Sequence, residues 1–117
     1  MYQDFLILGG AGLVGLQVCR RILTDLTPRR IVVASLFEHE AVAAVEALSE
    51  EFGNAAAYVP VWGNLFVPKE LAHVPRSEIL ASRQLRRRLL GTLYGDFDAA
   101  YGDNHLVRLI REHRPEV

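Results

Sequence analysis

A glycine-rich segment that follows a short apolar run limits the folds open to this chain more than any other feature of its sequence. The apolar run is FLIL at residues 5–8, and the segment GGAGLVG occupies residues 9–15. Adjacent large apolar residues are typical of a strand that is buried on both faces, as in a parallel sheet. Glycines at this spacing allow a tight turn out of such a strand and let a helix begin close against it.

The residues after this turn continue with helical spacing. Val14, Val18 and Ile22 are spaced four residues apart, which is typical of one face of a helix. Thr27-Pro28 is expected to end that helix. Cys19 lies next to this apolar row, and we expect it to be a buried small residue rather than a nucleophile.

Two further strands and a second helix are predicted downstream. A β-branched run at 31–34 predicts a buried strand, residues 38–52 predict an amphipathic helix, and residues 57–62 predict a third strand. Pro60 cannot donate a ladder hydrogen bond, so this third strand is expected at a sheet edge. The alternation predicts an α/β fold, a Rossmann-type parallel sheet of about three strands with flanking helices, which is an apparent half of a doubly wound fold.

The rest of the chain is less regular. Residues 67–103 are predicted to be an irregular or helical insertion, with one helix over 78–93. A last helix is expected to begin near Asp103 or Asn104 and to end before Pro115. The residues of this helix that are expected to face inward are Leu106, Leu109 and Ile110.

A fourth strand is expected after the last helix, and Val117 would be its first residue. Without that strand, the run at 5–8 would be an exposed apolar edge, which favours aggregation. We therefore expect residues 1–117 to be the N-terminal part of a longer protein. The alternative is a small domain whose bare edge pairs with another copy.

The composition excludes several classes of partner. The chain has 117 residues, of which 50% are hydrophobic and 23% charged, and its formal net charge is −1 at pH 7. This balance gives no overall attraction to nucleic acid or to acidic lipid. The single cysteine excludes an intrachain disulfide and favours a cytoplasmic location. The apolar stretch at 5–16 is too short to span a membrane, and the scattered histidines predict no metal site.

The glycine segment contains the pattern G-x-G-x-x-G at Gly10, Gly12 and Gly15, between a predicted strand and a predicted helix. In such a loop the middle glycine lets backbone amides approach a pyrophosphate, and the last glycine lets the helix pack on the sheet. The helix start adds free N–H groups and a positive dipole end. We therefore predict dinucleotide binding. The alternative is a strand–helix turn that binds nothing.

Residues 8–15, LGGAGLVG, resemble the opening T-G-G-A-G-F-I-G of the extended short-chain dehydrogenase/reductases, the NAD(P)-dependent epimerase/dehydratase group. Further similar segments are IVVAS at 31–35, VWGNL at 61–65 and HRPEV at 113–117. The resemblance covers about residues 4–66 and 104–117 and leaves 67–103 unmatched. Saccharopine-dehydrogenase-like reductases share the first strand and its glycine motif, but the Gly-Gly-Ala-Gly start fits the first family better.

The resemblance implies that the cofactor is NAD or NADP and that it lies across the carboxyl ends of the strands. Its pyrophosphate would lie on the loop, its adenine ribose near Ser35 and its adenine near Asn64. The cofactor-binding residues expected on this basis are Gly9, Gly10, Ala11, Gly12, Leu13, Val14, Gly15, Ser35, Leu36, Asn64 and Leu65.

Two of these positions depart from the family pattern. Ser35 stands where family members carry the ribose-binding acid, so NADP is not repelled and the choice between NAD and NADP stays open. Arg29 and Arg30 lie at the wrong end of the strand for the extra phosphate of NADP. His39 is a candidate for that contact, or a plain residue of the helix start. Asn64 replaces an aspartate, and its amide oxygen can still accept a hydrogen bond from adenine.

The chain lacks the Tyr-x-x-x-Lys pair with which this family transfers hydride. Lys69 is the only lysine, and the residue four positions before it is Leu65. We therefore expect the cofactor-binding domain of an oxidoreductase or epimerase, with no catalytic residue in this chain and a small-molecule substrate bound by a downstream portion. The alternative is a non-catalytic nucleotide-sensing or interaction domain that oligomerises through its first-strand edge.

Overall fold

The computed structural model describes residues 1–94 and 104–117, which belong to two compact units. The first unit comprises Met1–Gly63 together with His113–Val117 and contains the glycine segment. The second lies within Asn64–Glu112. Among the described residues, no helix is both long enough and apolar enough to cross a membrane.

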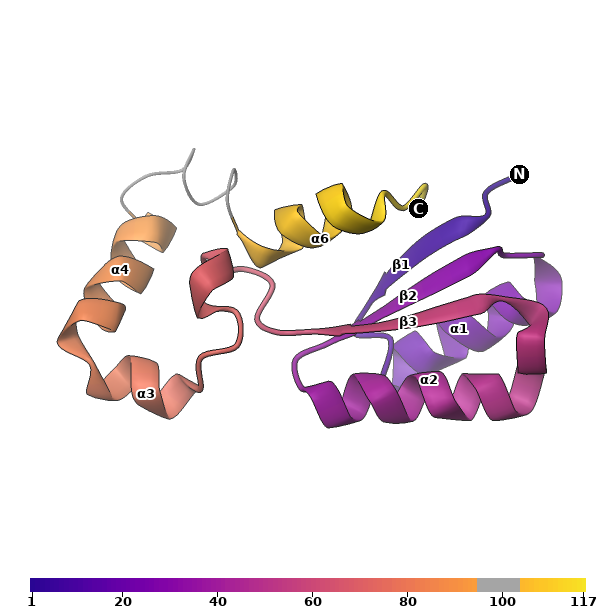
Figure 1. Ribbon diagram of the computed structural model, residues 1–117, viewed down its shortest axis with the longest axis horizontal. Helices are drawn as coiled ribbons and strands as arrows, with labels where there is room; N and C mark the ends of the chain where they lie inside the picture. Colours follow the sequence, from indigo (N-terminus) through magenta and orange to yellow (C-terminus); the bar gives the residue numbers. More distant parts are fainter. Residues whose placement is uncertain (95–103) are drawn as a thin grey trace. The chain divides into compact units, whose positions relative to one another are not determined.

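The first unit is a three-stranded parallel sheet with two helices on one face (Figure 1). Its elements are β1 (Asp4–Leu8), α1 (Leu13–Asp25), β2 (Arg30–Ser35), α2 (Glu38–Phe52) and β3 (Ala57–Trp62). A short 3₁₀ turn, η1 (Gly53–Ala55), joins α2 to β3, and the strand order is β1-β2-β3. The predicted α/β fold is confirmed as a Rossmann-like half fold, with Pro60 on an edge strand as expected.

Strand β2 is the centre of both the sheet and the core. Ile31 lies beside Phe5 of β1 and Tyr58 of β3. Ile31, Val32 and Val33 are all fully buried. The core cluster of buried residues is Phe5, Cys19, Leu23, Ile31, Val33, Ala44 and Leu48. Burial of a large aliphatic side chain contributes about 1.5–3 kcal/mol, so hydrophobic packing around β2 is the main source of stability in this unit.

Helix α1 buries only one end of the apolar row that its sequence pattern singles out. Val14 is 78% exposed and Val18 is 42% exposed, whereas Ile22 is half-buried against the core cluster. The side of α1 that meets the turn and the core is instead Gly15, Cys19 and Leu23, which also recur at helical spacing. Because Gly15 and Cys19 are small, the helix can lie close to the sheet, and this turns the valine row to the side. Cys19 is fully buried, as predicted.

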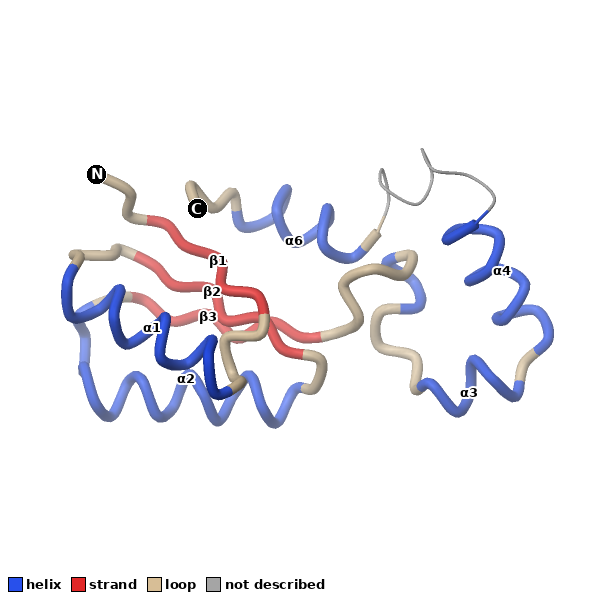
Figure 2. Tube along the Cα trace, turned by 180° about the vertical axis from the view of Figure 1, so that it is seen from behind, coloured by secondary structure: helices blue, strands red, loops and turns tan. Residues whose placement is uncertain are grey.

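The edge of β1 that faces away from β2 is hydrogen-bonded to the last residues of the chain. The amide of Val117 donates to the Asp4 carbonyl at 3.2 Å, and the amide of Leu6 donates to the Val117 carbonyl at 2.8 Å. These bonds follow the pattern of a parallel ladder, which the sequence predicts for the first residue of a fourth strand. The Glu116 carboxylate also accepts bonds from the amides of Gln3 at 2.9 Å and Asp4 at 3.1 Å. The segment therefore lies against β1 (Figure 2).

The described part of the second unit is mainly helical. Its elements are a 3₁₀ turn, η2 (Lys69–Leu71), and the helices α3 (Arg76–Ala81), α4 (Arg83–Tyr94) and α6 (His105–His113), the last residue of which belongs to the first unit. The prediction of one helix over 78–93 is wrong, because Ser82 is extended at φ −100° and ψ 119°. Its hydroxyl accepts a hydrogen bond from the Leu85 amide at 3.3 Å and so caps α4 instead of continuing α3. Residues 95–103 of the predicted insertion, Asp103 included, lie outside the described residues.

Asn104 caps the start of α6, as predicted, and its side-chain oxygen accepts a hydrogen bond from the Val107 amide at 2.8 Å. Leu109 is buried, whereas Ile110 is 44% exposed, so the inward position predicted for Ile110 is wrong. His105 is buried instead, with its ring edge-on to that of His73 at 5.3 Å between centroids. Leu106 is half-buried, so the helix turns its buried side towards His105 and Leu109 and away from Ile110.

A buried carboxylate joins β1 to the segment before β2 at the end of the sheet away from the glycine segment. Asp4 opens β1, and Arg29 donates to its Oδ1 from Nε at 3.1 Å and to its Oδ2 from a terminal nitrogen. Nε of Arg30 lies 3.8 Å from the same Oδ1. The hydrogen bond from Arg29 holds the pKa of Asp4 below its ordinary value, although burial acts in the opposite direction.

We expect Asp4 to make the stability of the chain depend on pH. Its folded-state pKa lies below the ordinary value of 3.8, so its contribution is complete above that pH and is lost as the pH falls through the folded-state pKa. Urea unfolding at about pH 7 and about pH 3 should show a larger loss of stability on acidification in the natural chain than in Asp4→Asn. Equal losses in the two chains would contradict this role.

Candidate functional site

Gly9 and Gly10 turn the chain from β1 towards the start of α1. Gly9 has a φ of 68°, a backbone conformation that favours glycine. The Gly10 amide donates to the Ala34 carbonyl at 3.1 Å, and the Gly12 amide donates to the Gly9 carbonyl at 2.9 Å. The turn is therefore attached to the carboxyl end of β2 before α1 begins.

Gly15 must be glycine for α1 to begin where it does. A Cβ at this position would lie 2.0 Å from the Gly9 carbonyl oxygen and 2.8 Å from Gly10 Cα. At Gly10 a Cβ would lie 2.8 Å from Cγ1 of Val33. Gly12 is less restricted, because the nearest atom to its Cβ would be the Gly9 carbonyl oxygen at 3.3 Å. Packing thus requires the first and last glycines of the motif and leaves the middle one for another role.

The first turn of α1 presents backbone amides that lack acceptors. Its N-cap residue, Gly12, has no side chain, and no acidic residue lies in that turn. Within the described part of the chain, no acceptor meets the amides of Leu13, Val14 and Gly15. The Leu13 side chain is 92% exposed, so this end of the helix is open to solvent. Free amides and the helix dipole together favour an anion such as a phosphate.

The carboxyl end of β2 places Ser35 and Leu36 at the same end of the sheet as residues 9–15. Ser35 is the register partner of Trp62, the last residue of β3. The Gly63 amide donates to the carbonyls of Ser35 at 3.1 Å and Leu36 at 3.2 Å. The residues predicted to bind the phosphates and the ribose therefore lie at the same end of the sheet, the carboxyl end of its strands.

A carboxylate that the sequence pattern did not single out lies beside Ser35. The Ser35 hydroxyl donates to Oε2 of Glu40 at 2.8 Å. Helical periodicity places Glu40 on the polar face of α2 and gives no reason to connect it with the strand. An acid in the first turn of a helix that directly follows a strand is the signal that could have identified it. His39, the other candidate here, stacks on Phe37 at 5.7 Å between ring centroids.

Asn64 and Leu65, the predicted adenine contacts, begin the second unit. Asn64 Oδ1 accepts a hydrogen bond from the Phe66 amide at 3.2 Å, and the Asn64 amide donates to the Ala72 carbonyl at 2.9 Å. The Leu65 carbonyl accepts a bond from the Leu106 amide at 3.0 Å. The side-chain oxygen predicted to accept from adenine therefore already has one donor, which leaves it one further lone pair.

Arg29 and Arg30 lie at the opposite end of β2 from Ser35, as predicted from the direction of the strand. Arg29 binds the Asp4 carboxylate, and Arg30 donates to the carbonyl of His113. Both guanidinium groups therefore belong to the contacts that join β1, β2 and the last residues of the chain.

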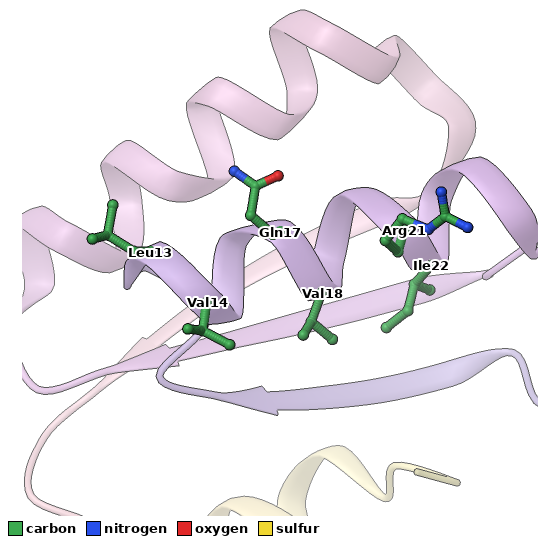
Figure 3. A pocket seen from close by; sticks show the side chains of 6 residues that line it. All are labelled: Leu13, Val14, Gln17, Val18, Arg21 and Ile22. Carbon is green, nitrogen blue, oxygen red and sulfur yellow. The ribbon is translucent and has the colours of Figure 1, made fainter.

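A shallow hollow of about 470 Å³ runs along α1 (Figure 3). Its lining residues are Leu13, Val14, Gln17, Val18, Arg21 and Ile22. Val14, Val18 and Ile22 project from one side of the helix, and Gln17 projects from the other. The one cation in this lining, Arg21, pairs with Asp25 at 2.5 Å. The hollow is an apolar surface, and its chemistry differs from that of the free amides at the helix start.

Comparisons with protein-family models, with curated proteins and with solved structures find no match. Among the described residues, no three His, Cys, Asp or Glu side chains are grouped so that they could hold a metal ion. The class of protein is therefore defined by its own fold and site, as an α/β half fold with a glycine turn and free amides at the start of α1. The likeness of residues 8–15 to the extended short-chain family stays a prediction.

We expect Gly15→Ala to destabilise the chain far more than Gly12→Ala. The new methyl group at position 15 would overlap the Gly9 carbonyl, and such overpacking costs about 3 kcal/mol or more. At position 12 the nearest atom lies at 3.3 Å, so the change should stay below about 1 kcal/mol. Urea unfolding followed by circular dichroism measures both values. Similar losses in the two variants would contradict the close approach of α1.

Cys19 should be unreactive in the folded chain. The residue is fully buried, and burial raises the pKa of its thiol to about 11. Because the thiolate is the reactive form, a disulfide reagent at about pH 8 should label Cys19 only after the chain has been unfolded in urea. Rapid labelling of the folded chain would show that α1 opens from the sheet.

Proposed function

We propose that this chain binds a dinucleotide cofactor, NAD or NADP, with its pyrophosphate on the loop of residues 9–15. The observation that carries the proposal is the approach of Gly15 to the Gly9 carbonyl, where a Cβ would lie only 2.0 Å away. This approach starts α1 directly against the turn, and among the described residues no acceptor meets the amides of residues 13–15 at that helix start, so they are open to an anion. A turn that only connected a strand to a helix would not require so close an approach.

The contact with the adenine ribose follows from the direction of the strands. Ligands of open parallel sheets bind outside the carboxyl ends of the strands. The adenine ribose would lie near Ser35 and Leu36 in the first unit, and the resemblance to the extended short-chain family assigns Asn64 and Leu65, which begin the second unit, to the adenine. The likeness of residues 8–15 to the epimerase/dehydratase group supports a role as the cofactor-binding domain of an oxidoreductase or epimerase, with the small-molecule substrate held by other residues.

The alternative, a nucleotide-sensing or interaction domain that oligomerises through the first-strand edge, has less of that edge to use. The backbones of Asp4 and Leu6 already bond to Glu116 and Val117. Only the part of the edge near Leu8 lies beyond this pairing. We therefore favour cofactor binding as the function of the first unit.

Titration with NADH and with NADPH, followed by the fluorescence of Trp62, tests the proposal. Trp62 is the only tryptophan and the register partner of Ser35, so a cofactor at this end of the sheet should change its emission. We expect saturable quenching that the oxidised cofactor reverses. A chain that circular dichroism shows to be folded and that gives no response to either cofactor would contradict the proposal.

The variant Gly12→Val tests whether the cofactor binds at the loop of residues 9–15. A side chain here meets few protein atoms but would occupy the space through which a phosphate reaches the amides, so affinity should fall by at least about tenfold. Gln17→Val is the matched control, because it adds the same side chain to an exposed position further along α1. Unchanged affinity in Gly12→Val would place the cofactor elsewhere.

A further inference from the structure

A carboxylate from α2 lies at the carboxyl end of β2, where the strand itself ends in Ser35. Glu40 lies in the first turn of α2, which begins at Glu38. An acid at this position of a helix commonly turns back to the backbone of the residue before the helix. Here Glu40 reaches further back and accepts a hydrogen bond from the Ser35 hydroxyl at 2.8 Å. The bond fixes the carboxylate at the strand end.

The Glu40 carboxylate keeps room for further hydrogen bonds. Ser35 engages Oε2, and no donor in the described part of the chain engages Oε1. The residue is exposed, so a ligand can reach it. An ionised carboxylate accepts about four hydrogen bonds and donates none. This end of the sheet therefore offers an acceptor for hydroxyl groups.

The same part of the sequence is poor in cations. No lysine or arginine occurs between Arg30 and Lys69, and five glutamates lie in this stretch. Arg30 is at the far end of β2, where it donates to the carbonyl of His113. His39 is the one histidine in the stretch, and its ring stacks on that of Phe37. A phosphate beside Ser35 would meet the charge of Glu40 without a guanidinium or ammonium group from these residues.

We propose that Glu40, held in position by Ser35, accepts a hydrogen bond from the 2′-hydroxyl of the adenine ribose and makes the site selective for NAD over NADP. The inference rests on the proposed dinucleotide function and names the cofactor that the site takes. The 2′-hydroxyl of NAD can donate to the carboxylate, whereas the 2′-phosphate of NADP is repelled by it. Glu40, in the first turn of α2, thus supplies the negative charge that is missing at the end of β2, where Ser35 replaces an acid.

Calorimetric titration of the natural chain, Glu40→Gln, Ser35→Ala and Glu38→Gln with NADH and NADPH tests the inference. The natural chain should bind NADH at least about tenfold more tightly than NADPH, since hydrogen bonds to charged groups are strong. Glu40→Gln should reduce this ratio by about tenfold or more, because NADH binds less tightly and NADPH more tightly. Ser35→Ala should reduce it less, because the positioning residue is lost but the charge remains.

Glu38→Gln is the matched control, because it removes one charge from the same helical turn and should leave the ratio nearly unchanged. Equal affinities in the natural chain, an unchanged ratio in Glu40→Gln, or an equal fall in Glu38→Gln would overturn the selectivity while leaving cofactor binding established. Failure of the folded natural chain to bind either cofactor would overturn the dinucleotide function and this inference together. A loss of stability in Glu40→Gln without a change in the ratio would assign Glu40 to the helix start alone.

Discussion

The approach of α1 to the turn at Gly9 is the contact on which the rest of the first unit depends. Because Gly15 has no side chain, the helix begins directly against the Gly9 carbonyl. The same row then brings Cys19 and Leu23 into the core that surrounds β2. The approach also places the first amides of α1, which meet no acceptor among the described residues, at the carboxyl end of the sheet. One steric requirement therefore connects the packing of the core with the chemistry of the loop.

The elements of the first unit could be predicted from the sequence because each depends on local patterns, such as the β-branched run of β2 and the Thr27-Pro28 pair after α1. The buried face of α1 could not. Its inward row begins with a glycine and a cysteine, whose small size decides the packing but gives little hydrophobic signal. Ser82 illustrates the same limit, because a single serine within an apolar helical pattern does not reveal that its hydroxyl caps a new helix.

The candidate site was predictable where its residues are consecutive in the sequence, as in residues 9–15. It was also predictable where the direction of a strand decides at which end of the sheet a residue lies, as for Arg29 and Arg30. Glu40 was missed because its carboxylate meets Ser35 only through the turn between β2 and α2. Helical periodicity shows which residues share one face of a helix, but it does not predict contacts across the turn that precedes the helix. The placement of Asn64 and Leu65 at the start of the second unit likewise depends on contacts that no pattern in the sequence specifies.

The pairing of Val117 with β1 has a practical consequence for the design of fusion proteins. Its carbonyl already accepts a hydrogen bond from Leu6, so a purification tag joined after Val117 starts in the ladder and runs along the open edge of the sheet towards Leu8. Apolar residues in such a tag would lie beside unpaired backbone groups of β1, an arrangement that favours further strand pairing. A tag placed before Met1, which is 92% exposed, begins in solvent instead. The choice of attachment point therefore decides whether the added sequence begins beside the sheet or in solvent.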